Sequence, residues 1–236
     1  MHAVRDFEDS TLWRVSAFER TLAETGNSGF AHWDVSSMLP TTFLADLRTL
    51  GYDTNGADVG AGLGADVLEV IASCVRHGQS ALLCLQHEGL VWPLTLFPEQ
   101  NLYHSPRDMQ QASTAGLARL SLLTVEPPGV RPPGHWMHER AGLADCYHDL
   151  QPLFWSLALH GPRRTLLTEI GGTAAYRMIA RPEPFRAGAS GALGPAIERL
   201  RRESVSLREM AAWPGLSIER ASRVLNGVYL CAPACS

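Results

Sequence analysis

The stretch SLREMAAWPGLSIERASRVLNGVYL, residues 206–230, constrains the fold most because it contains two helix starts with a tight turn between them. Ser206 followed by Glu209 is a capping-box pattern, in which the two side chains satisfy backbone N–H groups at the start of a helix. The segment WPGLS predicts a turn, and Ser217 is a good N-cap for the next helix. Apolar residues then recur at helical spacing: Ala221, Val224, Leu225 and Val228.

A third short helix precedes this pair. Pro195 suits its first turn, where the missing N–H costs no hydrogen bond, and Ile197 and Leu200 share one face. Three short helices joined in this way form a helix-turn-helix core. The segment resembles the winged-helix domains of bacterial regulators over about 40 residues. The resemblance implies a small helical domain used for DNA binding, protein docking or dimerisation, although LCAPACS leaves little chain for a wing hairpin.

Polar side chains near the start of the last helix are the candidates for DNA or partner contact. They are Arg208, Ser217, Arg220, Arg223 and Asn226. Arginines suit phosphate and guanine contacts, but Glu219 lies beside two of them and repels phosphate. Residues 191–236 hold 6 arginines against 4 glutamates, a weak excess for a dedicated DNA-binding domain. Both uses stay open, and docking or self-association is favoured over DNA binding.

Charge and composition predict two domains in one cytoplasmic protein. The chain has 236 residues, 45% of them hydrophobic, and a formal net charge of −4. No apolar run approaches the roughly 20 residues of a membrane span, and the acidic N-terminal stretch is unlike a signal peptide. Residues 1–190 hold 14 arginines against 20 acidic residues, opposite in balance to the tail. With a Pro/Gly linker at 180–194, the expected domains are 1–185 and 186–236.

The larger domain is predicted to be α+β, a small and largely antiparallel sheet with helices, which would sense a ligand or dock a partner. SALLCLQ and LVWPLTLF, separated by HEG, predict a hairpin. Pro93 should then lie at an edge or a bulge, since it cannot donate to a ladder. The other expected elements are helices at 10–25, 37–50, 65–77 and 149–161, a strand at 117–125 and a helix-like segment at 165–179.

Aromatic residues in and after the second strand of this hairpin are candidates for a partner-binding groove. They are Trp92, Phe97, Tyr103 and His104. An edge strand broken by proline offers free backbone groups to a binding partner. The same residues can equally pack beneath the turns.

The segment PGHWMHERAGLADCYHDL carries the best candidates for chemistry. His135, His138, Cys146 and His148 are zinc-compatible ligands, and their spacing, H-x2-H-x7-C-x-H, matches no standard zinc motif. The alternative is an ordinary loop with exposed histidines, which needs no metal.

No catalytic motif accompanies these residues. The chain lacks G-x-S-x-G, and the glycines at 60, 62 and 64 follow no predicted strand, unlike a dinucleotide-binding loop. The sequence therefore favours a non-enzymatic bacterial regulatory or adaptor protein without a cofactor. The alternative is a metal-binding protein, including a metal-dependent hydrolase, built on the histidine and cysteine cluster.

Overall fold

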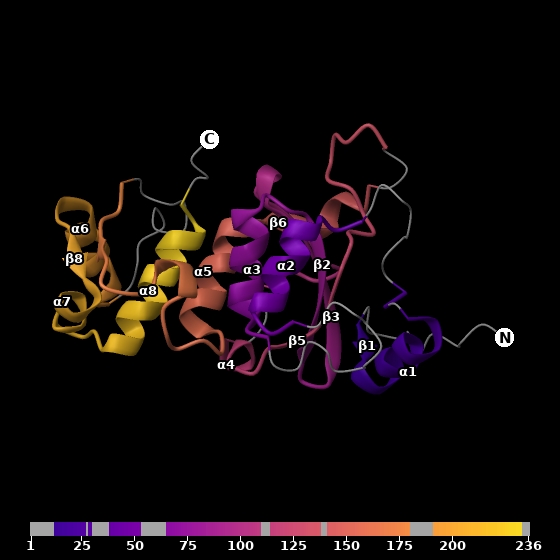
Figure 1. Cartoon of the computed structure of the whole chain (residues 1–236), viewed down its shortest axis with the longest axis horizontal. Helices are drawn as coiled ribbons and strands as arrows, with labels where there is room; N and C mark the ends of the chain where they lie inside the picture. Colours follow the sequence, from indigo (N-terminus) through magenta and orange to yellow (C-terminus); the bar gives the residue numbers. More distant parts are fainter. Residues whose placement is uncertain are drawn as a thin grey trace.

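The structure is a computed structural model that describes residues 12–26, 28–29, 38–52, 65–109, 114–137, 141–179 and 191–232. Helices pack on a central sheet, and a smaller group of helices lies at one end of the molecule (Figure 1). The α+β class predicted from the sequence is confirmed.

An antiparallel sheet of six strands forms the centre of the described part of the chain. The strand order is β5-β2-β3-β4-β6, and β1 pairs with the start of β3. The strands are β1 (Trp13–Arg14), β2 (Ala81–His87), β3 (Leu90–Phe97), β4 (Leu102–His104), β5 (Ser121–Glu126) and β6 (Tyr147–Asp149). The sequence predicted β2, β3 and β5, but β1, β4 and β6 are too short to show a strand period.

The β2/β3 hairpin follows from its turn. Glu88 and Gly89 both have positive φ, 50° and 79°, a combination that matches the right-handed twist of paired strands. Pro93 pairs with Cys84 in the interior of the sheet, whereas an edge or a bulge was expected. It is tolerated because β1 pairs with β3 at residues 90–91 and β4 pairs with it at 95–97. Pro93 falls in the interval between these two partners.

Helices bury both faces of this sheet. They are α1 (Val15–Thr25), α2 (Thr41–Thr49), α3 (Val67–Arg76), the short α4 (Thr114–Leu117) and α5 (Leu150–His160), with the 3-10 turns η2 (Pro98–Gln100), η5 (Ala144–Cys146) and η6 (Thr168–Ile170). No helix in the described residues is long and apolar enough to span a membrane.

Alternate side chains of the strands enter two different cores. Leu83 and Leu85 of β2 pack in the main core with α2, α3 and α5, while Leu82 and Cys84 pack in a second core against Phe18 of α1. Successive residues of a strand point to opposite faces, so a strand covered on both sides reads as a continuous apolar run. This is why the residues of SALLCLQ do not alternate between apolar and polar.

The C-terminal unit contains α6 (Leu193–Arg202), β8 (Val205–Ser206), α7 (Leu207–Ala211) and α8 (Ile218–Leu230). The helix predicted over 165–179 is wrong, because this segment forms η6 and then β7 (Ala175–Tyr176). Gly172 between them has φ +99°, which a helix does not contain. β7 pairs with β8, so the strand partner comes from upstream chain instead of a C-terminal wing.

The last helix belongs to both parts of the molecule. α8 packs along α5, as Figure 1 shows. A Cβ placed on Gly227 would lie 2.3 Å from the indole of Trp155, so only glycine allows this approach. Leu230 lies in the main core, while Leu225 lies in the core formed with α6 and α7. The boundary predicted at 185/186 lies outside the described residues.

Candidate functional site: the C-terminal helices

Two side-chain caps fix the geometry of α7, the turn and α8. Ser206 and Glu209 form the predicted capping box, with the Ser206 hydroxyl accepting from the Glu209 N–H and the Glu209 carboxylate accepting from the Ser206 N–H. Ser217 caps α8 by accepting from the Arg220 N–H, 3.2 Å away. The Ser217 hydroxyl is therefore part of the helix start. These caps were predicted from the sequence and are confirmed.

Two of the predicted contact residues point into the protein. The Arg223 guanidinium donates to the carbonyl oxygens of Leu159 (2.6 Å) and Gly161 (3.0 Å) at the end of α5. Its side chain is 13% exposed. Free carbonyls at a helix C-terminus attract cations, so this arginine stabilises the end of α5.

Asn226 is fully buried and joins the same face of α8 to the segment after α5. Its Oδ1 accepts from the Leu167 N–H and its Nδ2 donates to the Thr165 carbonyl, both over 2.9 Å. One amide side chain can satisfy a backbone N–H and a backbone carbonyl that form no hydrogen bond within a helix or a sheet. Asn226 is therefore a structural residue, and its side chain cannot reach a nucleic acid or a partner.

The buried stripe on α8 is the face that a DNA-reading helix would present. Residues 223, 226 and 230 form this stripe, with the half-exposed Glu219 at its start, and Ala221, Val224 and Leu225 on the other side pack against α6 and α7. In a helix-turn-helix the side opposite this core meets the major groove. Here α5 and the segment 161–167 lie against that side.

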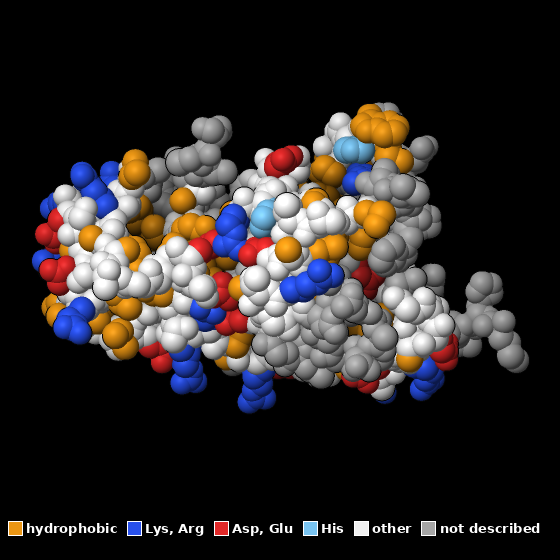
Figure 2. All heavy atoms as spheres, viewed as in Figure 1, with side chains coloured by type: hydrophobic (Ala, Val, Ile, Leu, Met, Phe, Trp, Pro, Cys, Tyr) orange, Lys and Arg blue, Asp and Glu red, His pale blue; other side chains and the backbone are white. Residues whose placement is uncertain are grey.

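The exposed remainder of the unit carries mixed charge. Arg208 is exposed, and the exposed Arg220 donates to the Gly215 carbonyl over 2.6 Å. Glu219 accepts from Arg223 at 3.2 Å and lies 3.9 Å from Arg164. On the face shown in Figure 2, arginines and acidic side chains alternate over this end of the molecule. Anionic DNA favours a continuous basic face, and this surface is not one.

The predicted groove residues form core instead of a groove. Trp92, Phe97 and Tyr103 are buried, and the Tyr103 hydroxyl donates to Asp108 over 2.8 Å. His104 is partly buried with its ring edge-on to Tyr147, 4.9 Å between centroids. Burial, with a smaller contribution from His148, lowers the pKa of His104, so its imidazole is neutral near pH 7. Trp92 and Tyr103 belong to the main core, and Tyr103 and His104 form the strand β4 between β3 and β6, which the sequence alone could not reveal.

The predicted metal ligands are only partly described. His138 lies outside the described residues, as do the glycines at 60, 62 and 64. His148 stacks on Tyr103 and His135 stacks on Trp136, so each imidazole has an aromatic neighbour. Within the described ranges, no three His, Cys, Asp or Glu side chains are grouped to hold a metal ion.

The comparisons with known proteins add no family or relative. No protein-family model, no curated protein and no solved structure matches this chain.

A projecting loop exposes apolar side chains that the sequence analysis did not consider, since it considered this segment for its histidines and cysteine. The described parts of the loop are residues 127–137 and 141–146, between β5 and β6 (Figure 1). Trp136 is 76% exposed and Leu143 is 77% exposed. The Tyr147 hydroxyl fixes the base of the loop, accepting from the Gly142 N–H over 2.7 Å and donating to the Arg131 carbonyl. A tryptophan in a proline-bounded segment was the signal available from the sequence.

Proposed function

We propose that this protein is a non-enzymatic regulatory adaptor that binds a protein partner, and that its C-terminal helices serve as a structural unit and do not read DNA. The observation that carries the proposal is the burial of the outer face of α8 against α5 and the segment that follows it. Arg223 and Asn226, the residues best suited to read bases, bind backbone groups of this protein. A docking role needs no free reading helix.

The projecting loop is the surface through which we expect the partner to bind. Tryptophans are enriched at the energetic centres of protein interfaces. Trp136 and Leu143 stand on a loop whose base is held by Tyr147. A surface that is ordered before binding loses less conformational entropy when the partner arrives.

Binding to duplex DNA distinguishes the adaptor from a DNA-binding regulator. Fluorescence anisotropy of the full-length protein with a labelled random duplex should show no micromolar binding at about 50 mM or about 200 mM salt. Micromolar, salt-sensitive binding that disappears in an Arg208→Ala, Arg220→Ala double variant would overturn the proposal. The matched control is Arg14→Ala, Arg20→Ala, which removes two exposed arginines at β1 and α1.

A second experiment tests the loop itself. The Trp136→Ala, Leu143→Ala variant should lose a partner that co-purifies with the wild-type protein after crosslinking in the source cells. Met38→Ala is the control, because Met38 is also an exposed large hydrophobic residue, at 72%. Equal recovery of the partner by the double variant, or recovery of none by the wild-type protein, would contradict the assignment.

A further inference from the structure

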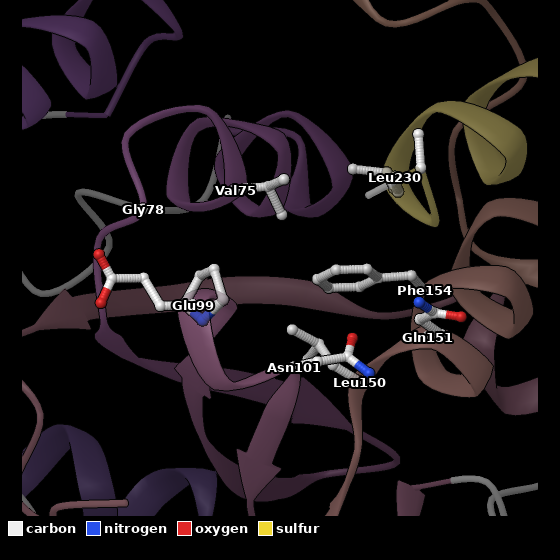
Figure 3. Close-up of a pocket in the computed structure, with 10 residues that line it drawn as sticks. Val75, Gly78, Glu99, Asn101, Leu150, Gln151, Phe154 and Leu230 are labelled. Carbon is white, nitrogen blue, oxygen red and sulfur yellow. The ribbon is translucent and has the colours of Figure 1, made fainter. Parts of the chain in front are cut away.

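A pocket of about 410 Å³ lies where the sheet body meets the end of α8. α3 forms one side, η2 and the residue after it form another, and the first turns of α5 and the end of α8 close the remainder (Figure 3). The volume falls in the lower part of the range of about 300–1,000 Å³ that is typical of small-molecule sites. The pocket shares no residue with the projecting loop or with the predicted contact residues of the C-terminal unit.

The pocket has an apolar wall between polar ends. Val75, Phe154 and Leu230 belong to three different helices, and Figure 3 shows the Phe154 ring reaching into the space between them. Gln151 lies at one end and the Glu99 carboxylate at the other, beside Gly78. The described lining residues are Val75, Gly78, Pro98, Glu99, Asn101, Leu150, Gln151, Phe154, Leu230 and Ala232.

Glu99 is the sole charged residue among these described lining residues. It follows Pro98 in η2, is exposed at the pocket mouth and forms no ion pair with any cation in the described residues. Arg76, the neighbour of Val75 in α3, is instead paired with Asp46 and Glu169. The negative charge at this end of the pocket is therefore uncompensated by the part of the chain that the structure describes.

The backbone holds the polar end in place. Asn101 ends η2 with φ 55°, a left-handed conformation that disfavours most side chains. Its carbonyl accepts from the Leu150 N–H over 3.0 Å, which ties η2 to the start of α5. The backbone of Asn101 is thus held, and its exposed side chain offers the pocket both a hydrogen-bond donor and an acceptor.

From this arrangement we propose that the pocket binds a small amphipathic ammonium compound. Its apolar body lies along Val75, Phe154 and Leu230, and its cationic head faces Glu99. An uncharged apolar compound would leave the carboxylate unpaired, and a carboxylate ligand would be repelled by it. The bound compound contacts the sheet body and the end of α8 together, so binding stabilises their junction.

Calorimetric titration with three probes of equal length tests this inference: hexylammonium, 1-hexanol and hexanoate. We expect hexylammonium to bind with a Kd of about 1 mM or tighter, as befits a compound of seven heavy atoms, and hexanoate not to bind. Glu99→Gln should weaken hexylammonium binding by about threefold to fivefold, as befits an exposed ion pair, and leave 1-hexanol unaffected. Glu19→Gln, an exposed glutamate on α1, is the matched control and should change nothing.

Side-chain methyl NMR locates the bound probe. Hexylammonium should shift the methyl signals of Val75, Leu150 and Leu230, which line the pocket, and leave those of Leu82 in the opposite core in place. Equal binding of hexylammonium and 1-hexanol, an unchanged affinity in Glu99→Gln, or no binding at about 10 mM would each overturn the inference. Because none of these readouts involves DNA or a partner protein, failure here leaves the adaptor proposal standing.

Discussion

Different kinds of interaction stabilise the sheet body and attach the C-terminal unit to it. In the sheet body, strands covered on both faces contribute consecutive side chains to two apolar cores. The C-terminal unit has a smaller core of its own. It is joined to the body by apolar packing, as of Gly227 against Trp155, and by polar side chains that bind backbone groups. These hydrogen bonds are directional, so they require one arrangement of the two parts.

The segment 161–170 lies at the centre of this junction. Asn226 of α8 binds it from one side. From the other side, the buried Glu69 of α3 accepts from the N–H and the hydroxyl of Thr168, at 2.9 and 2.7 Å. Arg163 contacts Glu69 at 2.7 Å and Asp66 at 2.9 Å. A loop without regular hydrogen bonding is thus fixed by side chains of two helices, which explains its order.

The largest expected effects come from truncating the two cores. Leu83→Ala and Met210→Ala each remove a fully buried side chain and should each cost about 2–5 kcal/mol of stability. Leu83 lies in the central sheet, so its loss should lower hydrogen-exchange protection throughout the protein. Met210 lies in the outer core, so its loss should expose α6 and α7 while β2 and β3 stay protected. Equal loss of protection in the sheet after Met210→Ala would show that the two cores are not separable.

A somewhat smaller effect is expected at the junction. Asn226→Ala leaves the buried Leu167 N–H without its partner and removes one of the two bonds to the Thr165 carbonyl, which keeps the bond from Arg163 Nε. This change should cost about 2–4 kcal/mol of stability. Urea denaturation of the variant measures this loss. Gln100→Ala, at an exposed position of η2, is the control and should stay within about 0.5 kcal/mol of wild type. A cost for Asn226→Ala as small as that of the control would mean that packing alone joins the two parts.

The two arginines of α8 allow a direct comparison of a residue at the junction with an exposed residue of the same helix. Arg223→Ala removes two bonds to carbonyls at the end of α5 and should cost about 1.5–3 kcal/mol. Arg220→Ala removes an exposed bond to Gly215 and should cost about 0.5 kcal/mol or less. Thermal and chemical denaturation of the two variants side by side decide the matter. Equal costs would refute the structural role given to Arg223.

The smallest expected effect is a pH dependence of stability, and it involves the sheet body alone. Burial raises the pKa of the Glu126 carboxyl above its ordinary 4.5, and hydrogen bonds from Ser28 and Thr124 oppose this only in part. The folded protein thus holds this proton more tightly than the unfolded chain does. The stability that Glu126 contributes is complete below pH 4.5 and is lost as pH rises through its folded pKa. The nearby Cys84 stays protonated, because burial raises its pKa to about 12.

Denaturation of the wild-type protein and of Glu126→Gln at several pH values from 4 to 7.5 measures this contribution of Glu126 to stability. The wild-type protein should lose stability relative to the variant as pH rises, because a glutamine cannot ionise. A constant difference between the two proteins over this range would show that Glu126 keeps its ordinary pKa. Glu19→Gln, on the exposed face of α1, provides the baseline.

Local signals predicted the elements that depend on local interactions. The HEG turn, the Ser206–Glu209 capping box and the Ser217 cap are each fixed by residues within a few positions of one another. The helix expected at 165–179 was wrong because much of this segment is a loop, which side chains of the distant helices α3 and α8 hold in place. The groove assigned to Trp92 and Tyr103 was wrong for a related reason, since both side chains pack in the main core with residues distant in sequence.

The sequence by itself therefore determined the α+β class, the central hairpin and the three C-terminal helices, because backbone propensity and capping act over a few residues. Only the tertiary structure decided which face of α8 is free. Nothing in the sequence marks Arg223, Asn226 and Gly227 as buried residues. Their burial depends on α5 and the segment after it, and the carbonyls that Arg223 binds lie more than 60 positions earlier in the chain. Contacts at that separation leave no periodic trace, so the use of a helix face is decided in space.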